Sequence, residues 1–389
     1  MPEFQTWQLL LFPLFFGLGW LAARVDIKQV VRESRSLPAS YFKGLNFLLN
    51  EEPDKAIDAF NEVVRVAPET IELHFALGSL FRRRGELERA IRLHQSLVDR
   101  EYLPADVACQ ALSELGQDYM KAGLLDRAEE VFTRLRGTAR DEEARRALLE
   151  IFQLEKDWER AIQIAGEMPG LVSQKEVAHY HCELAERDMA NSRWEDARAH
   201  LETALTLDRA CVRATLLCGD LLAREGKDAD AITLWQRVEN QNPVYLALAA
   251  PRLMSAYQRQ GLVADGLHLL RGYQERYPSL DLLDHVFRFV LEHEGVASAR
   301  ALARDELQRN PTLLGLDRFL EARLQELDAQ ARADAELMKS VVSAHTRRHA
   351  RNRCTACGFK ARQHYWRCPA CGGWETYPPR RAEDMDFSA

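Results

Sequence analysis

The sequence predicts an all-α protein in which an N-terminal single transmembrane helix is followed by an α-solenoid of helix pairs and a small C-terminal metal module. Three observations support this prediction. A skeleton of small residues, aromatic residues and prolines returns about every 34 residues, which is typical of a solenoid. An apolar run lies near the N-terminus, and four cysteines cluster near the C-terminus.

Residues 1–24 are expected to form a membrane anchor. Gln8 is the one polar residue in Trp7–Ala23, and a helix of about 20 residues spans about 30 Å, close to the hydrocarbon thickness of a bilayer. Basic residues follow the run and none precedes it, so we expect a periplasmic N-terminus and a cytoplasmic bulk. A cleaved signal peptide is the alternative because residues 21–23 are small or apolar, but Glu3 stands where such a peptide needs positive charge.

Residues 41–312 are expected to hold about eight helix pairs. In the first pair, Gly44 lets a second helix approach closely, Ala56 is the small residue on that helix, Phe60 fills the space between the two, and Pro68 ends the unit. The position of Ala56 recurs at Ala90, Ala128, Ala161, Ala197, Ala231, Gly266 and Ala299. This skeleton resembles the tetratricopeptide repeat, and an irregular all-helical domain is the alternative.

The segments on either side of the array are predicted from composition. Residues 25–40 are short and mixed in charge, which suggests a juxtamembrane linker. Residues 313–346 are rich in Ala, Glu, Leu and Arg and contain no proline. We expect them to form one long helix that caps the open end of the solenoid. Residues 380–389 are expected to be a tail.

The strongest chemical signal is a pair of CxxCG motifs at Cys354, Cys357, Cys368 and Cys371. Each motif places two thiolates on one side of a tight turn, and two facing turns form a tetrahedral S4 site for one metal ion. Residues 347–379 are too few to fold on apolar burial alone, so the ion is expected to stabilise them. The motifs resemble a rubredoxin knuckle pair with a shorter insert. Ligand type permits Zn or Fe, and an electron-transfer centre or a dithiol switch are the alternatives.

Other cysteines and histidines are interpreted as structural. Four cysteines are scattered through predicted helices and are expected to be small core residues. His179 and His181 are expected to pack within a helix, and His345 and His349 to lie on the surface. The scattered cysteines are Cys109, Cys182, Cys211 and Cys218.

Charge is unevenly distributed along the chain. The net charge is −7, yet residues 347–381 hold nine Lys and Arg against one acid, Glu375, so the remainder carries −15. The acidic array and the basic module should therefore attract each other or have partners of opposite charge. We expect docking of the module on the array to be sensitive to salt.

Enzyme and nucleic-acid functions are not favoured. The sequence contains no GxSxG, P-loop, HExxH or GxGxxG motif and no spaced acid pair that suggests catalysis. The basic module with its four aromatic residues could stack on nucleic-acid bases. In a tethered protein, however, acidic lipid headgroups or the acidic array explain the basic charge better, so we expect no nucleic-acid partner. The four aromatic residues are Phe359, Tyr365, Trp366 and Trp374.

The order of the parts resembles the lipopolysaccharide assembly protein B family of Gram-negative inner membranes. The resemblance rests on FPLFFGLGWLAAR, the repeat at 41–68, and the motifs CTACGF and CPACGGW. It implies a regulator of lipopolysaccharide synthesis that acts with the FtsH protease to promote degradation of the lipid A deacetylase LpxC, with iron on the four cysteines. A redox protein on a repeat scaffold and a general interaction scaffold are the alternatives, and a homo-oligomer stays open.

Overall fold

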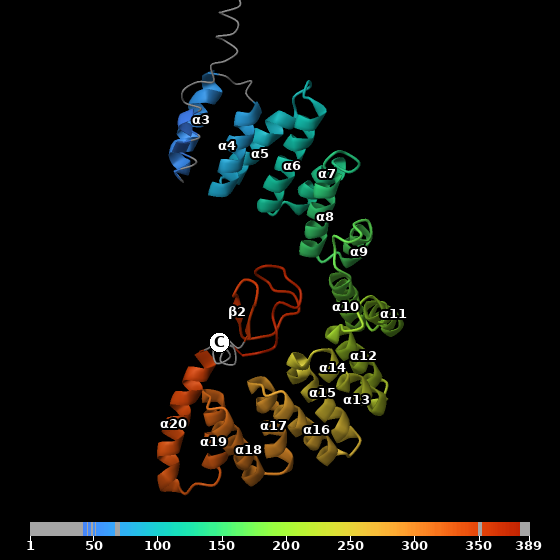
Figure 1. Ribbon diagram of the computed structural model, residues 1–389, viewed down its shortest axis with the longest axis vertical. Coiled ribbons are helices and arrows are strands. Elements are labelled where there is room, and N and C mark those ends of the chain that lie inside the picture. Colours follow the sequence, from blue (N-terminus) through green and yellow to red (C-terminus); the bar gives the residue numbers. More distant parts are fainter. Residues whose placement is uncertain are drawn as a thin grey trace, which may run out of the picture. The chain divides into compact units, whose positions relative to one another are not determined.

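The computed structural model describes residues 42–44, 46–47, 50, 52–66, 71–348 and 352–381 (Figure 1). The expected membrane anchor, the juxtamembrane linker and residues 382–389 of the expected tail lie outside the described residues. None of the helices within the described ranges combines the length and the apolar character that crossing a bilayer requires.

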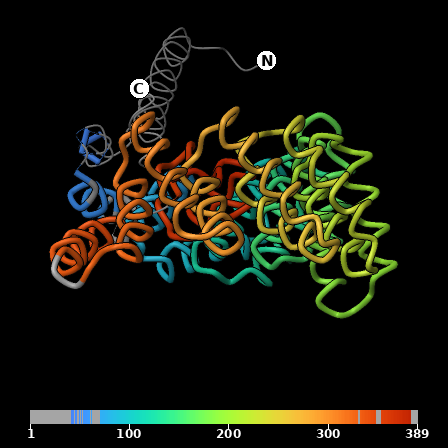
Figure 2. Tube along the Cα trace, turned by 90° about the horizontal axis from the view of Figure 1, so that it is seen from below, coloured from blue at the N-terminus to red at the C-terminus, as the bar shows by residue number. Residues whose placement is uncertain are grey.

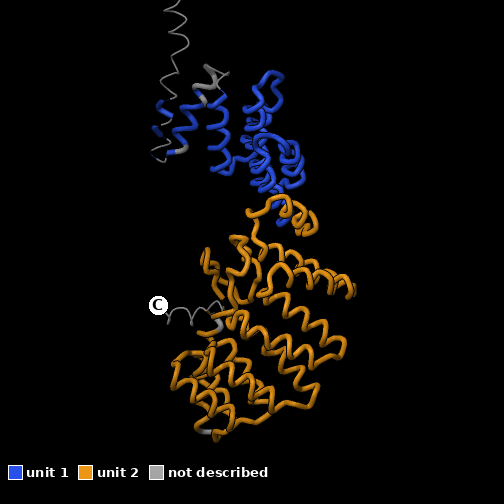
Figure 3. Tube along the Cα trace, turned by 45° about the vertical axis from the view of Figure 1, so that its right-hand side comes forward, with its two compact units in different colours: residues 1–155 blue, residues 156–389 orange. Residues whose placement is uncertain are grey.

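The chain divides into two compact units, residues 1–155 and residues 156–389 (Figure 3). Successive helices run side by side within each unit (Figure 2). The helices of the first unit are α3 (Pro53–Val66), α4 (Ile71–Arg84), α5 (Leu87–Val98), α6 (Ala105–Lys121), α7 (Leu125–Arg134) and α8 (Asp141–Glu155). Those of the second unit are α9 (Trp158–Gly166), α10 (Gln174–Ala190), α11 (Trp194–Leu207), α12 (Val212–Arg224), α13 (Asp228–Gln236), α14 (Val238–Gln241), the 3-10 helix η2 (Pro243–Tyr245), α15 (Leu246–Arg259), α16 (Val263–Arg276), α17 (Leu280–His293), α18 (Val296–Arg309), α19 (Leu313–Leu324) and α20 (Ala329–Arg348).

The repeating skeleton determines how the helices of a pair pack. All seven alanines at the repeated small position are fully buried. In four pairs, a glycine on the first helix faces the ring of a residue sixteen positions later, and a Cβ on that glycine would lie less than 3 Å from the ring. The expected role of Phe60 opposite Gly44 is confirmed. The four pairs are Gly44 with Phe60, Gly78 with His94, Gly116 with Phe132, and Gly219 with Trp235.

The expectation of one long helix over residues 313–346 is wrong, because this segment contains two helices, α19 and α20. The chain turns at residues 325–328, where Asp328 accepts a hydrogen bond from the Ala331 N–H at 2.9 Å and so caps the start of α20. Turning back lets α20 pack along α19 and bury Ala335. This tertiary contact outweighs the helical propensity of the intervening residues.

The C-terminal module is small and belongs to the second unit. Its strands β1 (Asn352–Arg353) and β2 (Lys360–Ala361) form one short antiparallel pair. Cys354, Cys368 and Tyr377 make up its buried core. Figure 1 shows the module on the inner side of the curve that α10 to α20 describe.

Candidate metal centre

Two tight turns position the four cysteines. In each turn, the glycine after the second cysteine donates its N–H to the carbonyl of the first cysteine, at 3.0 Å for Gly358 to Cys354 and 2.8 Å for Gly372 to Cys368. Both glycines adopt positive φ, 76° and 71° respectively. This conformation is unfavourable for residues with a Cβ, which explains why glycine follows each CxxC motif.

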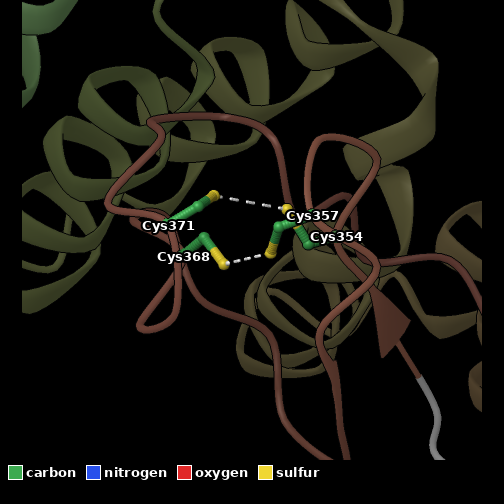
Figure 4. Close-up of side chains that lie close together, drawn as sticks. All are labelled: Cys354, Cys357, Cys368 and Cys371. Carbon is green, nitrogen blue, oxygen red and sulfur yellow. Dashed lines mark hydrogen bonds between the residues drawn. The ribbon is translucent and has the colours of Figure 1, made fainter. Parts of the chain in front are cut away.

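The four sulfur atoms converge on one point between the turns (Figure 4). Sγ of Cys354 lies 3.8 Å from Sγ of Cys371, and Sγ of Cys357 lies 3.7 Å from Sγ of Cys368. All four sulfurs lie within 4.8 Å of one another. A tetrahedron of thiolates around an ion at about 2.3 Å has sulfur–sulfur edges of about 3.8 Å, so the arrangement fits a single ion. The donor set suits either Zn or Fe.

The pKa values of Cys354 and Cys357 also indicate that the cluster needs a cation. Burial raises the pKa of Cys354, but its hydrogen bond with the Thr376 hydroxyl and hydrogen bonds from backbone N–H groups more than offset this and lower it to about 6. The pKa of Cys357 is raised to about 12: a backbone N–H at Phe359 lowers it, but desolvation and the three neighbouring thiols outweigh that effect. Four adjacent thiolates are therefore stable together only when a cation neutralises them.

One side of the sulfur cluster faces the interior and the other faces solvent. Cys354 and Cys368 are 1% exposed, whereas Cys357 and Cys371 are exposed to solvent. The buried pair is anchored by its contacts with Tyr377. An ion at this position is thus held from within and reachable by solvent from outside.

Aromatic rings attach the module to the helical array. The Trp374 ring stacks on the His179 ring of α10 with centroids 4.9 Å apart and an angle of 13° between the planes. Its edge also meets Trp158 and Tyr180, each at 5.9 Å. The Trp366 ring stacks on Tyr245 of η2 at 5.1 Å and 14°.

Polar contacts surround these rings. Glu375 Oε1 lies 3.2 Å from His179 Nε2, and this hydrogen bond lowers the pKa of Glu375 despite its burial. Arg381 Nε lies 2.7 Å from Asp281 Oδ1 of α17. The guanidinium of Arg213, an array residue, lies over the Trp366 ring at 6.0 Å. Arg381 thus forms an ion pair of the kind expected between a basic module and an acidic array. Most of these contacts between the module and the array, however, are made by aromatic rings.

Among the described residues, the remaining cysteines, histidines and module aromatic residues lie away from the four-sulfur cluster or pack inside the module. Cys182 and Cys211 are fully buried with sulfurs 4.0 Å apart, and Cys109 and Cys218 are partly buried. His345 is exposed, and His349 lies outside the described residues. His181 Nδ1 lies 3.2 Å from His200 Nδ1. Phe359 and Tyr365 are half-buried and pack on Tyr377 in the module core.

Sequence reasoning missed the part that His179 plays in docking. We expected His179 to pack within its own helix, and it is buried, but its ring contacts the module. Its partners stand almost two hundred residues later in the chain. Local spacing carries no signal for such a contact, since the contact depends on where the folded array places the C-terminal segment.

Comparisons with known proteins agree with this architecture. A family model described as a rubredoxin metal binding domain matches residues 353–379, and a tetratricopeptide repeat model matches residues 43–102 and 182–243. The chain is similar to lipopolysaccharide assembly protein B of Escherichia coli strain K12, with 32% identity over 385 residues, or 96% of this chain and 98% of that protein. The protein of the same name from Haemophilus influenzae is 29% identical over 386 residues, or 95% and 97% of the two chains. Among solved structures, the chain is similar to the TPR2AB domain of yeast Sti1 in its complex with pHSP90, at 18% identity and a TM-score of 0.31, over 68% of this chain and 95% of that one.

Proposed function

Because the chain belongs to the lipopolysaccharide assembly protein B family, we propose that it is a membrane-tethered adaptor that regulates lipopolysaccharide synthesis. The family and its repeat architecture are those of a scaffold and not of an enzyme. Arrays of paired helices offer extended surfaces to other proteins.

The proposed partners are the FtsH protease and the lipid A deacetylase LpxC. In this proposal, residues 1–24 anchor the protein in the inner membrane with the N-terminus in the periplasm, and the array presents LpxC to the protease. The apolar run and the basic residues that follow it support the anchor and its orientation. The family resemblance supports the identity of the partners.

We propose that Cys354, Cys357, Cys368 and Cys371 bind one ion, iron by family resemblance or zinc. The observation that carries the proposal is the convergence of their four sulfurs within 4.8 Å. The ion, when bound, supplies stability that a core of this size lacks. Trp374 and Trp366 then hold the module against α10 and η2, so that module and array together form the surface that partners meet.

The decisive experiment is affinity purification of the full chain from solubilised membranes. Wild type, Cys354→Ser and Cys371→Ser are compared, and Cys109→Ser, a partly buried cysteine of α6, is the matched control. We expect wild type and the control to recover FtsH and LpxC, and the two knuckle variants to recover much less. Equal recovery by all four proteins would show that the knuckle takes no part in the adaptor function.

Elemental analysis and visible absorption of the same preparations identify the ion. One equivalent of iron gives a coloured protein, whereas zinc, a d10 ion, gives a colourless one. Both knuckle variants are expected to lose the ion, and the Cys109→Ser control is expected to keep it.

A further inference from the structure

A second polar site lies where the metal module meets the C-terminal end of the array. It is a cavity of about 570 Å³ between helices α17, α19 and α20 on one side and the module on the other. Five of its lining residues are basic: Arg288, Arg318 and Lys339 from the array, and Arg362 and Arg381 from the module. None of these residues is a candidate metal ligand.

The cavity wall carries a surplus of positive charge. Against its five cations stand two lining carboxylates, Asp317 and Glu321. Both carboxylates are already engaged, since the Ser343 hydroxyl donates to Asp317, and Glu321 accepts from Arg318 and lies 3.6 Å from Lys339 Nζ. The cavity is therefore locally basic although the net charge of the chain is −7.

Three of the arginines share one carboxylate behind the wall. Asp284 on α17 lies 2.8 Å from Arg318 Nε, 3.1 Å from a terminal nitrogen of Arg288 and 3.6 Å from one of Arg381. Asp281 also accepts from Arg381, and Arg318 pairs further with Asp317 and Glu321. The arginines are thus held close together, and with Lys339 and Arg362 the five lining cations exceed these four carboxylates by one.

Arg362 completes the cavity from the module side. Its side chain is exposed, and it forms no ion pair with another described residue. An anion in the cavity would gain this cation without displacing a protein carboxylate. It would also contact both the array and the module and so hold the two together.

We propose that this cavity binds a phosphate group, carried either by a small soluble molecule or by a phospholipid headgroup. Clustered guanidinium groups match the geometry of phosphate oxygens, and Lys339 adds a point charge. The hydroxyl of Thr346 also lines the cavity and offers a further donor. Occupation stabilises the docked module because the ligand contacts groups from both sides.

The test is calorimetric titration of the full chain in a zwitterionic detergent. One arm uses inorganic phosphate and glycerol 3-phosphate, and a second uses dihexanoyl phosphatidic acid with dihexanoyl phosphatidylcholine as its zwitterionic counterpart. Stronger binding in the first arm identifies a soluble ligand, and stronger binding of the phosphatidic acid identifies a lipid headgroup. Either result supports the proposal. Absence of binding in both arms overturns it, and so does tighter binding of an oligoglutamate peptide than of any phosphate, which would assign the cavity to an acidic protein segment.

Substitution of lining residues tests whether phosphate binds in this cavity. Arg362→Gln and Lys339→Gln together should weaken phosphate binding about tenfold or more, since each removes one charged donor. Arg309→Gln, an exposed arginine of α18 outside the cavity, is the matched control and should bind like wild type. Melting curves without ligand confirm that all variants fold. Equal affinity of the double variant and the control would overturn the assignment to this cavity.

Discussion

The ring of His179 lies nearly parallel to that of Trp374, with centroids 4.9 Å apart. This one contact joins helix α10 to the turn that follows the second cysteine pair. His179 also reaches Glu375, so a single buried side chain of the array provides both a stacking surface and a hydrogen-bond partner. Attachment of the module therefore depends on how precisely α10 is placed.

Replacing Trp374 by alanine should loosen the module. The substitution removes stacking on His179 and edge contacts with Trp158 and Tyr180, each worth about 0.5–1.5 kcal/mol. Limited trypsin digestion should then cleave within residues 352–381 several times faster than in wild type. Tyr102→Ala, at an aromatic residue that is 92% exposed, is the control and should leave the rate unchanged. An unchanged rate in Trp374→Ala would mean that other contacts suffice for docking.

Gly219→Ala should destabilise the second unit by about 1–3 kcal/mol, because the added Cβ would lie 2.1 Å from Trp235 Nε1 and force the two helices apart. Gly272→Ala in α16 is the matched control. Its Cβ would meet only the flexible end of Arg276 at 3.7 Å, so the gain in helix propensity should stabilise by up to about 1 kcal/mol. Chemical denaturation measures both, and equal midpoints for the two variants would contradict the packing argument.

The stability of the array should fall in mild acid. Burial and the neighbouring His200 lower the pKa of His181 to about 4, below the value of about 6.5 in an unfolded chain. The folded state therefore binds fewer protons than the unfolded state between these pH values. The contribution of His181 is complete above about pH 6.5 and is lost as the pH falls toward 4.

Urea unfolding at pH 7 and pH 5 checks whether stability falls with pH in this way. His181→Gln should lose less stability than wild type between the two pH values. His268→Gln, at an exposed histidine of α16, should behave like wild type. If His181→Gln and wild type lost stability equally, the pH dependence would arise elsewhere.

A buried polar pair in the first unit should be strongly coupled. His94 occupies the position that Phe132 fills in the next repeat, and its Nδ1 lies 2.5 Å from Asp118 Oδ2. Asp118 also lies 2.6 Å from Arg82, and both His94 and Asp118 are fully buried. Asp118→Ala should therefore cost about 2–4 kcal/mol, since it leaves buried donors without their acceptor.

Adding His94→Phe to Asp118→Ala should recover a large part of that loss, because phenylalanine fills the same space without needing an acceptor. The thermodynamic cycle of the two single variants and the double variant measures the coupling energy. Additive losses would show that His94 and Asp118 contribute independently.

The sequence predicts structural features whose residues lie close together along the chain, and it does not reveal contacts between residues far apart in the chain. The opposition of Gly219 and Trp235 lies within one repeat, so spacing alone predicts it, and the cysteine turns are equally local. The turn before α20 contains neither glycine nor proline, and its cause is packing against α19. Trp374 meets His179 only after the whole second unit has folded, so no local pattern reveals this contact.

The docked module covers the His179 surface of α10. A protein that needs the His179 surface for itself can bind only after the module has moved away. Such a protein and the docked module are competitors, and thermodynamic reciprocity requires each to weaken the other by the same factor. Access to this face of α10 therefore depends on how firmly the module is docked.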